Sequence, residues 1–197
     1  MILSIDPGKV TTMALINSET LKLVDAAELE LTYGSEPCQR FNQIGAEINF
    51  TLSEFLLDRK DQVEKVYLEV PYSIGFSGNP YVYNRQGRNA FDIVKLMSTV
   101  FAIYGQLCLF FEEGVEIVTV PATYWLGSKE TFEYKKKCCY DLIDYDYWKK
   151  ERGWKILKSK DGLQDSVLMA YRCTRDWNLQ HRVKNFMNAD FSRRKQK

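Results

Sequence analysis

The sequence has few of the residues that build zinc sites and disulfide frameworks. It has one histidine, His181, and five cysteines, which are irregularly spaced and form no C-x-x-C pair. This pattern argues against a zinc centre and against a disulfide framework, and it favours reduced thiols in a cytoplasm. His181 has no acidic neighbour in the sequence, so we assign it no catalytic role.

Long hydrophobic runs, internal repeats and linkers are also missing. No apolar run reaches membrane-spanning length, and the first residues do not resemble a signal peptide. We therefore expect a cytoplasmic protein without a membrane partner. A chain of 197 residues suffices for one domain with a sizeable core.

Charge is nearly balanced overall but unevenly distributed. The formal net charge is +1, yet residues 182–197 contain six basic residues and one acidic residue. Such an end is typical of a solvated tail and, in fewer proteins, of an arm that binds a phosphate backbone. We expect one folded domain over residues 1–180 and a basic C-terminal tail over residues 181–197.

Residues 1–16 form the most informative stretch. The apolar run from Met1 to Ile5 ends on Asp6, Pro7-Gly8 turns the chain, and Val10 to Ile16 runs back as a second apolar strand. This pattern predicts a hairpin whose first strand, apolar on both faces, lies centrally in a sheet. Asp6 then stands at the end of the central strand, where it either binds a divalent metal ion or caps its own turn.

The rest of the chain alternates strands and helices. We expect strands over 21–31, 66–70 and 116–120, and helices over 39–58, 89–109, 122–126, 132–143 and 162–176. Residues 71–88 form a long loop rich in glycine, aromatic residues and arginine, and residues 147–160 show no clear periodicity. This order predicts an α/β domain in which α-helices flank a central mixed β-sheet.

Acidic residues stand at matching ends of these elements. Asp6 and Glu69 each end a buried strand, and Asp161 and Asp165 open the last helix. All four can face one cleft, because strand ends and helix starts converge at one edge of such a sheet. Carboxylates gathered in this way repel one another unless cations hold them, and oxygen-only ligands suit Mg²⁺ or Mn²⁺. Two such ions about 4 Å apart can support phosphodiester hydrolysis.

These motifs resemble a known family, the RuvC family of Holliday-junction endonucleases in the RNase H-like superfamily. The likeness is nearest to short, diverged phage and prophage members. Ile2 to Gly8 resembles the family's first-strand motif, Val66 to Glu69 its second, and Asp165 to Ala170 its last. Pro121, Trp125 and Gly127, followed by lysines, resemble the stretch before the last helix.

The resemblance implies a Holliday junction resolvase, a metal-dependent endodeoxyribonuclease of DNA recombination and repair. It implies an RNase H-like fold, a homodimer that cuts branched DNA to leave 5′-phosphates, and two Mg²⁺ or Mn²⁺ ions per active site. A phage-encoded enzyme would act in the host cytoplasm. Asp6, Glu69 and Asp165 would be catalytic metal ligands. The family usually has a fourth ligand where this chain has Gly162, so we assign that role to Asp161, which is otherwise an N-cap.

The resemblance also implies which residues contact DNA. An aromatic wedge is expected three residues after Glu69, and basic residues are expected near the scissile phosphate. The DNA-binding residues predicted in this way are Tyr72, Arg85, Arg88, Lys135 and Lys137. The loop after Glu69 has three further aromatic residues, Phe76, Tyr81 and Tyr83. The other interpretation is that some of these rings pack beneath their loop and that the lysine run is a solvated helix face.

Two other functions remain open. A catalytically inactive DNA-binding module of the same fold would bind without cutting, although the presence of all four acids argues against it. An actin-like or sugar-kinase-like ATP phosphotransferase is suggested by Asp6-Pro7-Gly8 followed by Thr11-Thr12. That fold needs two lobes, and the chain has no internal repeat.

Overall fold

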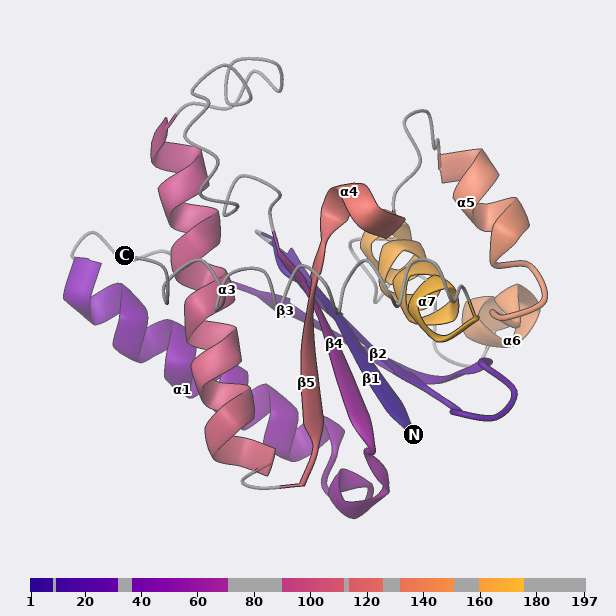
Figure 1. Ribbon diagram of the computed structural model, residues 1–197, viewed down its shortest axis with the longest axis horizontal. Helices are drawn as coiled ribbons and strands as arrows, with labels where there is room; N and C mark the ends of the chain where they lie inside the picture. Colours follow the sequence, from indigo (N-terminus) through magenta and orange to yellow (C-terminus); the bar gives the residue numbers. More distant parts are fainter. Residues whose placement is uncertain are drawn as a thin grey trace, which may run out of the picture.

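A mixed β-sheet forms the centre of the protein. The computed structural model describes residues 1–8, 10–31, 37–70, 90–111, 114–125, 132–150 and 160–175 (Figure 1). Within these ranges the sheet has the strand order β3-β2-β1-β4-β5. The strands are β1 (Ile2–Asp6), β2 (Val10–Ile16), β3 (Leu23–Glu30), β4 (Lys65–Val70) and β5 (Glu116–Pro121).

The pairing of the strands matches the fold class expected from the sequence. Strands β1, β2 and β3 form an antiparallel meander, and β4 and β5 continue the sheet parallel to β1. β1 is the central strand, as predicted, and β3 lies at one edge of the sheet. The prediction of an α/β domain with a central mixed sheet flanked by helices is therefore confirmed.

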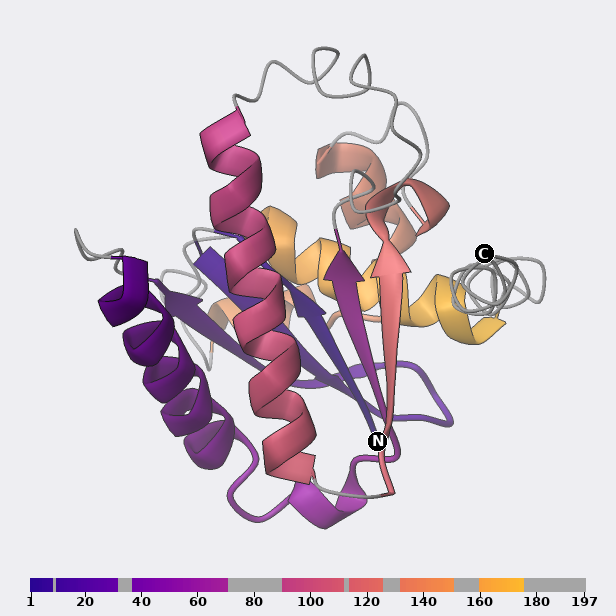
Figure 2. The same ribbon diagram turned by 60° about the vertical axis from the view of Figure 1, so that its left-hand side comes forward.

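Helices cover both faces of the sheet in two layers (Figures 1 and 2). On one face, α1 (Pro37–Phe55) packs beside α3 (Ala90–Phe111). On the other face, α7 (Lys160–Arg175) lies across β1 and β2 with α4 (Ala122–Trp125) and α5 (Phe132–Cys138) against it. The short helix α6 (Tyr145–Lys150) lies beside them, and a 3-10 turn spans Lys60–Gln62.

Alternating residues of β1 enter separate cores on the two faces. Leu3 and Ile5 join the core under α1 and α3, whereas Ile2 joins the core under α7. Ser4, on the α7 face, is fully buried and donates a hydrogen bond from Oγ to the Ser166 carbonyl oxygen at 2.6 Å. Asp6 follows on this same face, because successive side chains of a strand alternate between faces.

Three polar contacts fix how α7 crosses the sheet. Besides the Ser4 bond, Ser166 Oγ donates to the Thr12 carbonyl oxygen at 3.3 Å. Near the other end of α7, the hydroxyls of Tyr67 and Thr174 lie 3.5 Å apart. The first turns of α7 therefore lie over the carboxyl end of β1, and its last turn lies over Tyr67.

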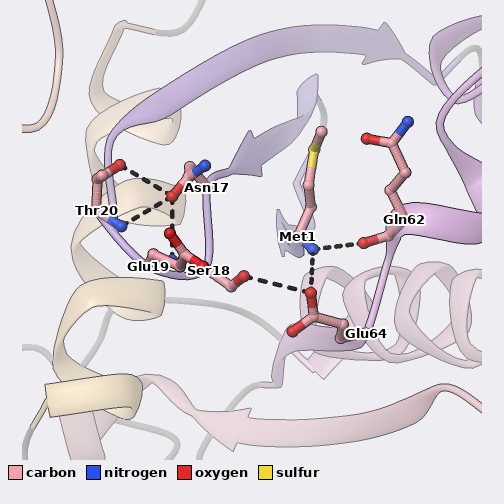
Figure 3. Close-up of polar contacts among 7 residues, drawn as sticks. All are labelled: Met1, Asn17, Ser18, Glu19, Thr20, Gln62 and Glu64. Carbon is pink, nitrogen blue, oxygen red and sulfur yellow. Dashed lines mark hydrogen bonds and ion pairs between the residues drawn. The ribbon is translucent and has the colours of Figure 1, made fainter.

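Polar contacts also close the opposite end of β1 (Figure 3). The Met1 ammonium group donates to the Gln62 carbonyl oxygen and, at 2.8 Å, to Glu64 Oε1. The hydrogen bond and charge of this ammonium group lower the pKa of Glu64. Ser18 Oγ donates to the same carboxylate at 3.3 Å, so the turn after β2 is tied to the start of β4. These contacts hold the end of β1 that lies away from Asp6.

Two elements differ from the sequence prediction. Residues 145–150 form α6, which was not predicted and overlaps the start of the stretch without clear periodicity at 147–160. Its one buried residue is Trp148, so it has no repeating apolar stripe that would have indicated a helix. The helix expected over residues 132–143 ends at Cys138, and turns occupy residues 139–142. None of the helices in the described ranges is long and apolar enough to cross a membrane.

We expect Ser4→Ala to destabilise the protein by about 1 kcal/mol, because it removes a buried hydrogen bond between β1 and α7. Urea denaturation followed by circular dichroism measures this free energy of unfolding. Ser18→Ala, which removes an exposed hydroxyl contact, should change it by less than about 0.5 kcal/mol. Equal effects of the two substitutions would contradict a special role for the Ser4 contact.

Candidate active site

Two carboxylates lie side by side where the central strands end. β1 and β4 are parallel with Ile5 opposite Leu68, so Asp6 and Glu69 are the next residues along each strand. Each lies two residues after a residue that faces α7: Asp6 after Ser4 on β1, and Glu69 after Tyr67 on β4. Side chains two apart on a strand share a face. The hairpin and the buried strand predicted from the sequence therefore bring Asp6 and Glu69 together under α7.

Two further carboxylates reach the same place from α7. Asp161 and Asp165 are four residues apart and share one face of the helix. The Lys135 ammonium group, which comes from α5, lies between them, 3.0 Å from Asp161 Oδ1 and 2.5 Å from Asp165 Oδ1. The side chains of Lys135 and Asp165 are 7% and 15% exposed, whereas that of Asp161 is 58% exposed.

The pKa of Asp6 shows that these charges act on one another. Burial raises the pKa of Asp6 well above its usual value, and the charge of Glu69 raises it further. Asp165 and, more weakly, Asp161 act in the same direction, while the positive charge of Lys135 opposes them. The four acids predicted from the sequence therefore interact around Asp6.

Lys135 is the counter-ion within this group. Burial alone would lower its pKa, but its hydrogen bonds and charge interactions with Asp165 and then Asp161 raise the pKa. Lys136 and Lys137 are exposed on the same helix. The lysine run is thus a solvated helix face at two positions and a buried ion pair at the third.

Thr12, which the sequence suggested only as part of a kinase-like hairpin, adds a polar group beside the acids. It pairs directly with Asp6 across the hairpin, and alternation along β2 puts its side chain on the α7 face. The residue is fully buried, and among the described residues its Oγ1 has no hydrogen-bond partner. The signal that could have found it is its place opposite Asp6 in the hairpin.

The chemistry of the site suits a hard divalent cation. Its donors are carboxylate and hydroxyl oxygens. Burial and then the charges of neighbouring acids raise the pKa of Asp6, and a bound cation relieves repulsion of this kind. No three acidic, histidine or cysteine side chains in the described ranges are arranged to share one metal ion. In this arrangement an ammonium group, that of Lys135, lies between two of the acids.

The other predicted site residues have different outcomes. Asp161 is not the N-cap of α7, because the helix begins at Lys160 and Asp161 lies in its first turn. An acidic side chain there interacts favourably with the helix dipole. Lys137 is exposed on α5, on the helix that supplies Lys135. Tyr72, Arg85 and Arg88 lie outside the described residues, as does the tail 181–197.

Comparison with known proteins finds likeness at the level of structure. No family model matches the chain, and no curated protein matches it. Thermus thermophilus RuvC in complex with a Holliday junction substrate is 19% identical, with 95% of each chain covered and a TM-score of 0.47. A second Thermus thermophilus RuvC structure is 16% identical, covering 95% of this chain and 96% of that one, with a TM-score of 0.47.

A viral enzyme is similar as well. Fowlpox virus resolvase in complex with substrate Holliday junction DNA is 16% identical, covering 88% of this chain and 95% of that one, with a TM-score of 0.44. The structural neighbours thus include RuvC, which gives its name to the family that the sequence motifs resemble, and a poxvirus resolvase.

We expect Asp6→Asn to stabilise the protein when metal ions are removed with EDTA. The substitution removes a buried charge whose pKa is raised, so ionised Asp6 costs stability at neutral pH. A rise of roughly 2–4 °C in the unfolding midpoint corresponds to about 1 kcal/mol in a domain of this size.

The pH dependence gives this prediction a second test. The difference between the two proteins should be full above the raised pKa of folded Asp6 and vanish as the pH falls below the ordinary value of 3.8. Differential scanning calorimetry across this range measures it. Asp58→Asn, at an exposed position, is the matched control. A destabilised Asp6→Asn protein at neutral pH would contradict the charge repulsion described above.

Proposed function

We propose that the protein is a structure-selective DNA endonuclease that cleaves four-way (Holliday) junctions and other branched DNA. The observation that carries the proposal is the group of four interacting acids around Asp6, at the shared carboxyl end of β1 and β4. Repelling carboxylates in a half-buried place cost stability, so an arrangement of this kind indicates a function that requires it.

The acids would hold the metal ions of such an enzyme. Asp6, Glu69, Asp161 and Asp165 would bind two Mg²⁺ or Mn²⁺ ions, because all four offer the oxygen ligands that these ions prefer. When bound, the ions would supply activation of a water and stabilisation of the leaving oxygen in phosphodiester hydrolysis, leaving 5′-phosphates. Thr12, buried opposite Asp6, carries a hydroxyl that makes no hydrogen bond within the described residues.

The DNA would be bound by basic and aromatic residues around this centre. Lys137 is exposed on α5, close in sequence to Lys135 at the acids, so it is available to a phosphate group. Tyr72, Arg85 and Arg88 follow Glu69 directly along the chain, and we propose that they contact the bases and phosphates at the junction. The basic tail would add sequence-independent attraction to the DNA backbone.

A junction cleavage assay tests this function. We expect the protein to cut a labelled four-way junction with Mg²⁺ or Mn²⁺, and Asp6→Asn to lower the rate by about a hundredfold or more, because it removes a metal ligand. Flaps, forks and plain duplex run beside the junction measure structure selectivity. Binding of the junction in a mobility-shift assay should survive the substitution.

Other results of this assay would favour another function. Cleavage that Asp6→Asn leaves unchanged would show that the metal ligands are wrongly assigned. Junction binding without cleavage by the unsubstituted protein would favour an inactive DNA-binding module, and ATP binding in calorimetry would favour a phosphotransferase. Asp58→Asn again serves as the control, because its carboxylate is exposed after α1.

Paired cuts in a symmetric junction require two active sites, so we propose a homodimer. Sedimentation equilibrium should then give a mass near twice 23.0 kDa. A junction that yields paired cuts within one binding event, in a cruciform plasmid assay, would support the same conclusion. A monomer that nicks flaps and never makes paired cuts would indicate a debranching nuclease instead.

A further inference from the structure

The Lys135 ammonium group occupies the position of a cation among the acids. It lies within 3.0 Å of Asp161 Oδ1 and 2.5 Å of Asp165 Oδ1, and its side chain is 7% exposed. A buried ammonium group with two carboxylate partners is strongly held.

The surroundings of α5 place Lys135 there. The Lys135 carbonyl oxygen accepts a hydrogen bond from the Cys139 backbone N–H at 2.9 Å. The buried Cys139 thiol lies 3.7 Å from the Gln164 carbonyl oxygen. Gln164 Nε2 also donates to the Tyr145 hydroxyl at 3.1 Å. Gln164 precedes Asp165, so these contacts fix the end of α5 against the part of α7 that carries the acids.

We infer that Lys135 competes with the divalent metal ions for Asp161 and Asp165. Its ammonium group must withdraw from these carboxylates before they can bind an ion. The inference rests on the proposed function, since it takes these acids as metal ligands. Two positive charges cannot share the same carboxylate oxygens without strong repulsion. Lysine suits such a role, because its flexible stem lets the ammonium group leave without moving the helix.

This arrangement makes Lys135 a regulator of metal loading. In the metal-free protein it offsets the charge of two acids, and in the loaded protein it is released toward solvent or toward a bound phosphate. The metal concentration at which the site fills is therefore set partly by the strength of the lysine–aspartate contacts. Removing the lysine should tighten metal binding and make the metal-free protein less stable.

Metal affinity tests the inference without any substrate. We expect Lys135→Gln to bind Mn²⁺ about tenfold or more tightly than the unsubstituted protein in isothermal titration calorimetry, because a charged hydrogen bond no longer competes. Lys136→Gln is the matched control: it removes the same charge from the adjacent exposed position of α5 and should leave the Mn²⁺ affinity unchanged. In EDTA, Lys135→Gln should also unfold at a lower temperature than the unsubstituted protein, and added Mn²⁺ should restore the lost stability.

The outcomes separate this inference from the proposed function. Unchanged or weaker Mn²⁺ binding by Lys135→Gln, with binding still lost in Asp6→Asn, would overturn the competition and leave the metal site intact. If the protein shows no Mn²⁺ binding that is lost in Asp6→Asn, both proposals are overturned. Equal tightening by Lys135→Gln and Lys136→Gln would reduce the effect to general charge and so contradict a direct contact.

Chemical labelling of the unsubstituted protein provides a test that does not depend on a variant folding. In EDTA the Lys135 amine should react slowly with an acetylating reagent, because it is buried and paired with two carboxylates. Saturating Mn²⁺ should raise its labelling several-fold, as read by mass spectrometry, while Lys136 on the same helix stays constant. Labelling of Lys135 that does not respond to Mn²⁺ would overturn the inference.

Discussion

The mutual repulsion of carboxylates around Asp6 is the constraint on which the rest of the site depends. Burial and three neighbouring acids raise the pKa of Asp6, so the folded chain holds these groups at a cost in free energy. The cost is tolerated because the elements that carry the acids are anchored elsewhere: β1 by two apolar cores, and α7 by its contacts with Ser4 and Thr12. The residues of β1 before Asp6 thus belong to the scaffold, and Asp6 at the end of the same strand belongs to the site.

Parts of this arrangement could be predicted because their signals are local. An apolar run ending in Asp-Pro-Gly predicts a central strand and a hairpin, and both are present. The strand that carries Glu69 and the helix that carries Asp165 were likewise visible as an apolar run and an apolar period. We expected the ends of these elements to meet at one edge of the sheet, because a chain that alternates strands and helices favours parallel pairing.

The remaining parts depend on contacts between distant residues, which no local pattern records. Lys135 looks the same as Lys136 and Lys137 in the sequence, and only the packing of α5 on α7 buries one of the three. The place of Thr12 beside Asp6 depends on strand pairing, and α6 has one buried residue, Trp148, and so no apolar stripe that predicts a helix. Tyr72, Arg85 and Arg88 lie outside the described residues, so their roles stay predictions.

The lysine bridge between Asp161 and Asp165 has a consequence for how the polypeptide matures. A cluster of like charges with no internal partner would have to await an ion before its helix could settle on the sheet. Because the Lys135 ammonium group offsets the charge of two of these acids, the helix can settle on the sheet without a bound ion.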